Sequence, residues 1–182
     1  MPKIWKKLSS KVIHKDPWST IHLDTVIKPD GKPGNYAWLQ VPSQGVMVLA
    51  ITEKQEIYLV KLFRYPTKMY FWELPGGGSG NQNSLKAAKR ELWEETGLVA
   101  KTWKKLGESQ NFNSFSDAKT DIYIATNLTQ TGLDKKHEDG IVEVKKIPLK
   151  KVLQMVESKK ITEVKVIAAL TLYFLKNKKI KI

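Results

Sequence analysis

Three glutamates near the middle of the chain are spaced so that they could bind a metal ion together. Glu91, Glu94 and Glu95 follow the spacing i, i+3 and i+4, which places them on one stripe of a helix. Carboxylates this close repel one another unless a cation lies among them, and oxygen ligands are what Mg²⁺ or Mn²⁺ prefers. The alternative is a solvated acidic face on which Arg90 pairs with Glu94. The spacing alone leaves both interpretations open.

A helix that ends at Gly97 would position these carboxylates. Leu85, Ala88 and Leu92 recur at helical spacing and form one apolar stripe, roughly a quarter-turn from the glutamates. A run of glycines follows Pro75 before this helix. Glycine has no side chain, so its backbone can approach a metal ion or a ligand closely. The same run could also be no more than a flexible turn.

The amino-acid sequence of this region resembles a known motif. Residues 90–98 read RELWEETGL, with Gly76 upstream. This resembles the Nudix box, Gx5Ex7REUxEExGU with U apolar, the signature of hydrolases that split a nucleoside diphosphate linked to another group. The resemblance implies that Arg90 supports the glutamates as part of the catalytic machinery. It implies Mg²⁺ as the cofactor, with Mn²⁺ as the alternative, bound by Gly76, Glu91, Glu94 and Glu95.

One position departs from the box. Gln82 stands where the motif has its first glutamate, and a neutral amide adds no charge to a metal site. The general base is then expected elsewhere, and relatives that cleave ADP-ribose recruit an acid from a late loop. Glu138 and Asp139 occupy the matching region and are the candidate catalytic acids, although a solvated turn acid is the commoner state. The alternative is a module that binds nucleotide sugars but has lost the chemistry.

The resemblance extends to the ADP-ribose and nucleoside diphosphate sugar pyrophosphatases, and it is carried by residues 16–18, 24–26, 29–34, 60–66, 72–75 and 148–172. In that group the arginine matching Arg64 reaches a substrate phosphate, and Trp18 is a candidate to stack on the nucleobase. Each could instead be a structural residue. The enzymes typically carry a proline where this chain has Asn113 and Ser114, which leaves room for other nucleotide sugars. The expected substrate-binding residues are Trp18, Arg64, Glu73, Phe115, Ser116 and Asp117.

The order of the expected elements predicts an α/β (α+β) fold, and the resemblance implies the same architecture: a Nudix-like α/β/α sandwich with a mixed β-sheet and an N-terminal antiparallel β-ribbon. We expect residues 1–42 to form the ribbon and residues 43–182 to form the Nudix catalytic domain. The ribbon is expected to contain two strands, residues 21–27 and 36–41. Two strands alone are marginally stable, so the ribbon should pack against another sheet or chain. Members of the group are homodimers through this ribbon.

The remaining elements are expected as follows. Strands should cover residues 45–51, 57–65, 99–106, 121–126 and 141–147, with polar loops at 107–117 and 133–140. A helix after Pro148 should bury Leu149, Val152, Leu153 and Val156. A last helix over residues 162–175 should bury Val164, Ile167, Ala168, Thr171 and Leu172.

The amino-acid composition limits the expected binding partners and the expected cellular location of the protein. The net charge is +13, but the lysines are dispersed without a long basic tract, so the charge suits a small phosphorylated anion and nucleic acid is not the expected partner. An enzyme that trims RNA 5′ ends is the alternative suggested by that charge. There is no cysteine, which is compatible with a reducing cytoplasm. No apolar run approaches the roughly 20 residues that cross a bilayer, and the basic N-terminus lacks the apolar region of a signal peptide. We therefore expect a cytoplasmic protein without a membrane partner.

Overall fold

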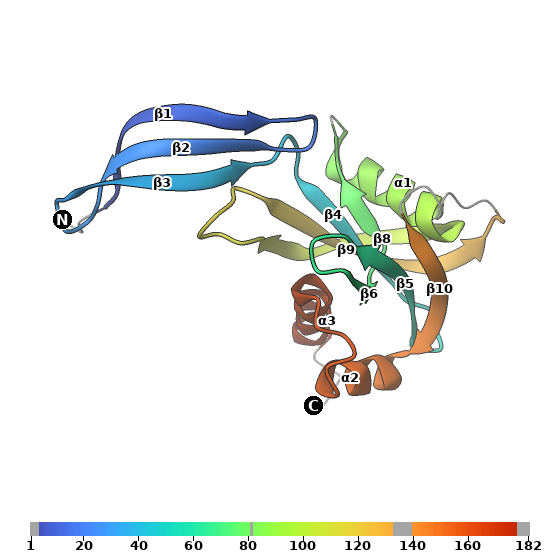
Figure 1. Cartoon of the computed structure of the whole chain (residues 1–182). Helices are drawn as coiled ribbons and strands as arrows, with labels where there is room; N and C mark the ends of the chain where they lie inside the picture. The colour runs from blue at the N-terminus through green and yellow to red at the C-terminus, as the bar shows by residue number, and fades with distance from the viewer. Residues whose placement is uncertain (1–3, 81, 133–139, 178–182) are drawn as a thin grey trace. The chain divides into compact units, whose positions relative to one another are not determined.

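The computed structural model describes residues 4–80, 82–132 and 140–177. The chain divides into two compact units. The N-terminal unit contains residues 1–44 and 110–119, and the box unit contains residues 45–109 and 120–182. Figure 1 shows the elements of both units along the chain.

The N-terminal unit is built on an antiparallel sheet of three strands in the order β1-β2-β3. The strands are β1 (Lys6–Lys15), β2 (Thr20–Ile27) and β3 (Pro33–Gln40). The antiparallel ribbon is confirmed, but the expectation of two strands was wrong because β1 was missed. Irregularities between Lys7 and Ser9 and between Val12 and His14 interrupt the register of β1 with β2. They break the alternation of side chains by which a strand is predicted.

Residues 110–119, far along the chain from the three strands, also belong to the N-terminal unit. The Leu39 amide donates to the Phe115 carbonyl at 2.7 Å, and the Asp117 amide donates to the Leu39 carbonyl at 3.2 Å. These bonds fasten residues 110–119 to the end of β3. The loop predicted at 107–117 is shorter than expected, because the strand before it continues to Gln110.

The box unit contains two sheets. One has the order β7-β4-β9-β8 and is formed by β4 (Gly45–Ala50), β7 (Gly76–Gly78), β8 (Leu98–Gln110) and β9 (Lys119–Gln130). Because β4 runs parallel to β9 and antiparallel to β7, this sheet is mixed, as predicted. The other sheet is antiparallel, has the order β10-β5-β6, and is formed by β5 (Glu56–Arg64), β6 (Met69–Glu73) and β10 (Ile141–Pro148).

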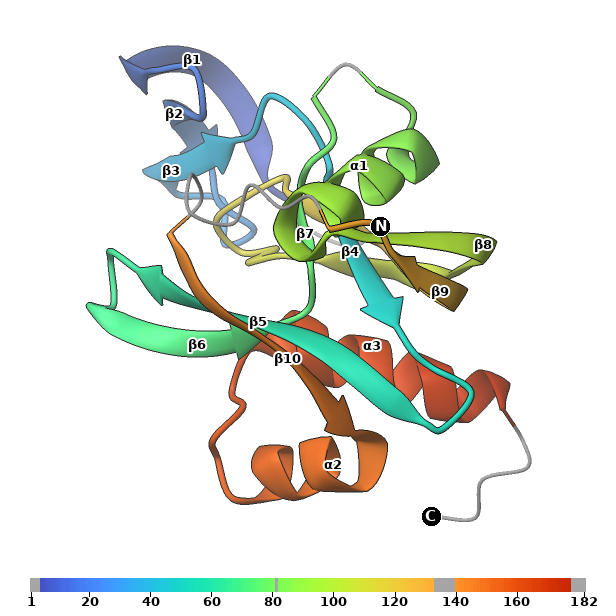
Figure 2. The ribbon, with the colours of Figure 1, turned by 90° about the vertical axis from the view of Figure 1, so that its right-hand side faces the viewer.

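Three helices are described in the box unit: α1 (Ser84–Thr96), α2 (Leu149–Glu157) and α3 (Val164–Lys176). Successive residues of β4 point to opposite faces of the sheet. One face packs against α1 through Val46, Val48, Ala50, Ala88 and Leu92. The other face packs against α3 through Met47, Leu49, Ile51, Val166 and Ala169. The sheet therefore lies between helices, as Figure 2 shows, and the predicted α+β fold with a mixed sheet is confirmed.

The predicted inward faces of α2 and α3 need correction. In α3 the buried residues are Val166, Ala169, Leu170 and Tyr173, whereas the predicted residues Val164, Ile167 and Thr171 are exposed. The residues VKVIAALTLYFL are apolar almost all round the helix, so periodicity could not choose a face. In α2, Met155 is buried and Leu153 is exposed. A helix of nine residues makes only two to three turns, which leaves its phase poorly determined by pattern.

Candidate active site

Helix α1 is held at both ends by local bonds. The Asn83 side chain accepts a hydrogen bond from the Leu85 amide at 3.0 Å, which caps the start of the helix. Gly97 adopts the left-handed conformation, with φ of 68°, and its amide donates to the Trp93 carbonyl at 2.8 Å. The helix ends where the glycine pattern predicted.

The Arg90 guanidinium connects the parts of the box. Its Nη1 donates to Glu94 Oε2 at 2.7 Å, and its Nη2 donates to Glu91 Oε1 at 2.5 Å and to the Gly78 carbonyl at 2.9 Å. Its Nε donates to Gln82 Oε1 at 3.4 Å. Burial works against the charged form, but the carboxylates of Glu91 and Glu94 outweigh it and raise the pKa of Arg90. We call Arg90 with these four partners the Arg90 clasp.

The glycine strand β7 runs beside two of the glutamates. The Gly76 amide donates to Glu95 Oε2 at 2.9 Å, and Glu95 is buried. A Cβ atom at Gly77 would lie 2.7 Å from Glu91 Oε1, closer than contacting atoms approach. A Cβ atom at Gly76 would lie 2.2 Å from the Val46 carbonyl oxygen. Glycine is therefore required at position 76 by the backbone of β4, whereas at position 77 a larger residue would displace the Glu91 carboxylate.

The donor chemistry of this region fits a divalent ion. Carboxylate oxygens from Glu91, Glu94 and Glu95, with backbone carbonyls of β7 close by, are the hard oxygen ligands of Mg²⁺. The Glu91 carboxylate lies in the space that a side chain at position 77 would take. Within residues 4–80, 82–132 and 140–177, no three His, Asp or Glu side chains are gathered closely enough to hold one ion. Two of the glutamates are bound to Arg90 instead, and Glu95 is bound to the Gly76 amide.

Arg64 and Glu73 form a second ion pair in the box unit. Arg64 Nε and Nη2 donate to Glu73 Oε1 and Oε2 at 2.8 and 2.7 Å, a bidentate geometry. The Glu73 side chain is 5% exposed and the Arg64 side chain is 46% exposed. The hydrogen bonds that Arg64 donates to Glu73 are the main cause that raises the pKa of Arg64, and the carboxylates of Glu95 and Glu163 add to it. Two predicted substrate-binding residues thus contact each other, and three N–H donors of Arg64 are not used by Glu73.

Glu163 is a residue that sequence reasoning missed. Its Oε2 accepts a hydrogen bond from the Val166 amide at 2.9 Å, so it caps the start of α3, and its charge acts on Arg64. The spacing from residue 163 to residue 166 is that of a helix cap. Glutamate is not among the residues preferred at that position, which hid the signal.

The other predicted site residues lie in the N-terminal unit or outside the described residues. Trp18 is 81% exposed, and its amide donates to Asp16 Oδ1 at 2.8 Å. Phe115, Ser116 and Asp117 belong to the segment fastened to β3, where Asp117 Oδ1 accepts from the Val41 amide at 3.0 Å. Glu138 and Asp139 lie outside the described residues.

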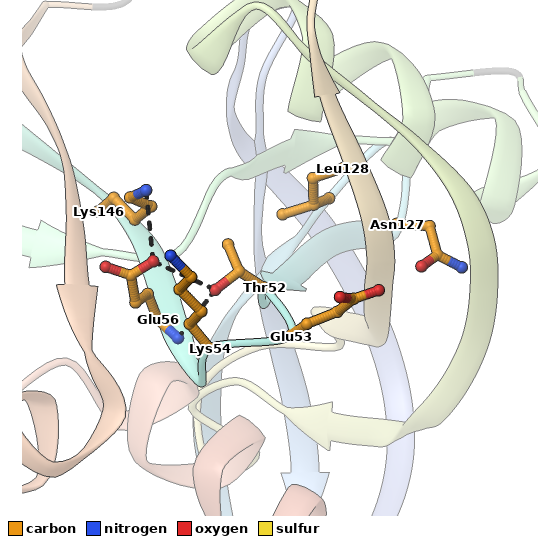
Figure 3. A pocket seen from close by; sticks show the side chains of 7 residues that line it. All are labelled: Thr52, Glu53, Lys54, Glu56, Asn127, Leu128 and Lys146. Atoms are coloured by element: carbon orange, nitrogen blue, oxygen red, sulfur yellow. Dashed lines mark hydrogen bonds and ion pairs between the residues drawn. The ribbon is translucent and has the colours of Figure 1, made fainter.

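A separate pocket of about 410 Å³ opens in the box unit, and Figure 3 shows its polar lining. The lining residues are Thr52, Glu53, Lys54, Glu56, Asn127, Leu128 and Lys146. Lys146 pairs with Glu56 at 3.3 Å across one side of it. None of these residues belongs to the box, so this pocket is not the candidate active site.

Comparison with known protein families shows which family the sequence motif around α1 belongs to. A model of the NUDIX domain matches residues 41–170, and a model of the nucleoside diphosphate sugar hydrolase N-terminal domain matches residues 5–39. The chain belongs to the Nudix family. The predicted resemblance and the predicted enzyme class, a Nudix pyrophosphatase, are both confirmed by these matches and by the relatives below. Nudix hydrolases generally use a divalent metal ion.

Individual proteins support this membership of the Nudix family. An ADP-ribose pyrophosphatase of Bacillus subtilis is 31% identical over 169 residues, which cover 88% of this chain and 90% of that protein. An ADP-ribose pyrophosphatase of Mycobacterium tuberculosis is 32% identical over 139 residues, covering 74% of this chain and 66% of that protein. A solved structure of an ADP compounds hydrolase has the same fold, with a TM-score of 0.85 at 20% identity over 98% of this chain and 97% of that one. None of the helices in the described part of the chain has the length and apolarity needed to cross a bilayer.

Proposed function

We propose that this Nudix enzyme hydrolyses the diphosphate bond of ADP-ribose or of nucleoside diphosphate sugars, with Mg²⁺ as the metal and Mn²⁺ as a substitute. Water adds its oxygen to one phosphorus, the bridging P–O bond breaks, and the products are a nucleoside monophosphate and a sugar phosphate. The match of the N-terminal domain model and the two pyrophosphatase relatives support this substrate class.

The Arg90 clasp is the observation that carries the proposal. It fixes the carboxylates of Glu91 and Glu94 against the carbonyl of Gly78, while Glu95 is held by the Gly76 amide. These glutamates, with a Gly76 carbonyl, would hold the divalent ion, which neutralises phosphate oxygens and lowers the pKa of the attacking water. Arg90 limits the freedom of the ligands, as groups around metal ligands do in other proteins.

The substrate side of the proposal rests on Arg64. Glu73 holds its guanidinium in one orientation through two hydrogen bonds, so its other N–H groups have a defined direction in which to meet a phosphate. This makes Glu73 a positioning residue for Arg64. Trp18 for the base, and Phe115, Ser116 and Asp117 for the terminal sugar, remain proposals from the resemblance. So do Glu138 and Asp139 as the source of the general base.

We further propose a homodimer formed through the N-terminal unit. All ten residues of β1 are exposed in the single chain, and they include the large apolar side chains of Leu8, Val12 and Ile13. A long strand with apolar side chains in water favours association. Sedimentation at several concentrations tests this, and a monomer at high concentration would contradict it. A cytoplasmic location and the absence of membrane and nucleic-acid partners remain predictions.

A hydrolysis panel tests the activity. ADP-ribose, ADP-glucose, GDP-mannose and UDP-glucose are each incubated with the protein and Mg²⁺, and a phosphatase converts the products to free phosphate. We expect release from at least one compound, abolished by a chelator. If the protein binds these compounds but releases no phosphate from any of them, the result would instead support a binding module that is catalytically inactive because Gln82 replaces the glutamate. Activity confined to capped RNA would support the RNA alternative.

A further inference from the structure

The neutral residue Gln82 lies beside the one cation of the box, Arg90. The loop of residues 79–83 reads SGNQN and contains no acid, so it brings no negative charge to the box. Gln82 is exposed, and its amide oxygen accepts from Arg90 Nε at 3.4 Å, longer than most N–H···O hydrogen bonds. This long, neutral bond leaves the positive charge of Arg90 to be balanced by other groups.

The groups that balance the charge of Arg90 are two of the proposed metal ligands. Arg90 Nη2 donates to Glu91 Oε1 at 2.5 Å, and Nη1 donates to Glu94 Oε2 at 2.7 Å. The other acceptor in the Arg90 clasp is the neutral carbonyl of Gly78, at 2.9 Å. In the part of the chain that the structure describes, Arg90 forms ion pairs with no further carboxylate. Glu91 and Glu94 therefore share its charge between them.

These two ion pairs are shielded from water well enough to affect a metal ion. The side chains of Glu91 and Glu94 are 9% and 22% exposed, and partly buried pairs are screened much less than surface pairs. Hydrogen bonds between charged groups are also about twice as strong as neutral ones. Arg90 thus orders the two carboxylates and at the same time reduces their negative potential. A divalent cation that approaches them meets a positive charge already bound there.

We infer that Gln82 weakens the binding of the divalent ion, because it leaves the whole charge of Arg90 on the metal carboxylates. The inference rests on the metal site of the proposed function and concerns how that site is regulated. Glutamate at position 82 would give Arg90 Nε a charged acceptor outside the ligand set and would add a negative charge. Glutamine provides neither, so occupancy of the site follows the free Mg²⁺ concentration over a higher range.

The strength of the Arg90 clasp sets the size of the effect. The apparent affinity of a ligand falls by the fraction of molecules that are not free to bind it. Each molecule in which Arg90 occupies both carboxylates must loosen those bonds before a metal ion can collect the same oxygens. A charged partner at position 82 would draw the guanidinium toward the loop and raise the fraction that is free. Metal affinity should therefore change more than the rate at saturating metal.

Binding of Mn²⁺ alone to the full chain, without substrate, tests the inference. Free Mn²⁺ is measured by electron paramagnetic resonance, and Mg²⁺ affinity follows from competition. Gln82→Glu should strengthen Mn²⁺ binding by about threefold to thirtyfold. Gln82→Leu should stay within about twofold of the wild type, because it removes only a neutral bond. Gln154→Glu, which adds the same charge at an exposed position of α2, should leave Mn²⁺ binding unchanged.

A nuclear magnetic resonance measurement on the metal-free protein follows Arg90 itself. In Gln82→Glu the Nε–H resonance of Arg90 should shift, and its exchange with water should slow, because the bond to residue 82 becomes charge-assisted. An unchanged resonance would show that Gln82 does not act through Arg90, and the inference would fall whatever the metal affinity.

A gain in Mn²⁺ affinity below about threefold in Gln82→Glu would overturn the inference, as would an equal gain in Gln82→Leu or Gln154→Glu. A gain well above thirtyfold would overturn it too, since the new carboxylate would then be a metal ligand itself. If neither the wild type nor Gln82→Glu binds Mn²⁺, the metal site of the proposed function fails as well. Binding by the wild type that Gln82→Glu leaves unchanged refutes the inference alone.

Discussion

Replacing Arg64 by methionine should destabilise the protein through the carboxylate that it leaves behind. The Glu73 side chain is 5% exposed and receives both of its charged hydrogen bonds from Arg64 at 2.8 and 2.7 Å. Breaking a fully buried pair costs about 3–5 kcal/mol, and breaking an exposed pair costs about 0–1 kcal/mol. Since Arg64 is 46% exposed, water reaches one side of this pair. We therefore expect Arg64→Met to lower the free energy of unfolding by about 2–3 kcal/mol.

Urea unfolding of the single variants and of the double variant measures this coupling. With a slope of about 2 kcal/mol per molar urea, the Arg64→Met midpoint should fall by about 1 M. Arg64→Met combined with Glu73→Leu should recover most of the loss, because no charge is then left buried. The control is Glu108→Gln, which breaks an exposed pair of 3.7 Å with Lys105 and should cost less than about 0.5 kcal/mol. If Arg64→Met unfolds like the wild type, or if the double variant is no more stable than the single one, the reasoning is wrong.

Two substitutions in the box and one titration in the N-terminal unit give three further predictions. In Gly77→Ala the new methyl group would displace the end of the Glu91 side chain. The kcat for nucleotide-sugar hydrolysis should therefore fall at least about tenfold, while the thermal unfolding midpoint changes little. Normal activity of this variant would contradict the packing of β7 against Glu91. Gln82→Glu should change kcat by less than about tenfold, because the amide oxygen already accepts from Arg90; a large gain measured in the same assay would mean that the natural enzyme is weakened. Asp16 should titrate at about 2 rather than 3.8, because its carboxylate is bonded first to His14 and then to backbone amides. Because the pKa is lowered in the folded protein, the contribution of Asp16 to folding stability is complete above pH 3.8 and disappears as the pH falls toward 2. NMR titration of the Asp16 carboxyl group measures this pKa. A midpoint near 3.8 would exclude these hydrogen bonds in solution.

The box was predictable because its determinants are local in sequence. The spacing of Glu91 and Glu94, the stripe of Ala88 and Leu92, and the left-handed Gly97 all act within one helix, and a helix repeats by fixed geometry. The i, i+4 pair between Arg90 and Glu94 follows from the same geometry.

Side-chain contacts that depend on how strands and helices pack in three dimensions were not predictable from the sequence. Arg64 meets Glu73 on the β5-β6 hairpin although the register pairs Arg64 with Met69 and Glu73 with Val60, and no short-range pattern predicts such a contact. The contribution of Glu163 to the charge around Arg64 depends on where α3 begins in space.

The Mg²⁺ dependence of ADP-ribose hydrolysis in the wild type and in Glu95→Gln tests the proposed metal site most directly. Glu157→Gln, a change at an exposed glutamate at the end of α2, is the matched control. The expected result is a Mg²⁺-dependent turnover that Glu157→Gln retains. Glu95→Gln should lose at least about a hundredfold in kcat or need far more Mg²⁺, because it would remove one of the proposed charged oxygen ligands. Full Mg²⁺-dependent turnover in Glu95→Gln would contradict the assignment of the box carboxylates to the metal.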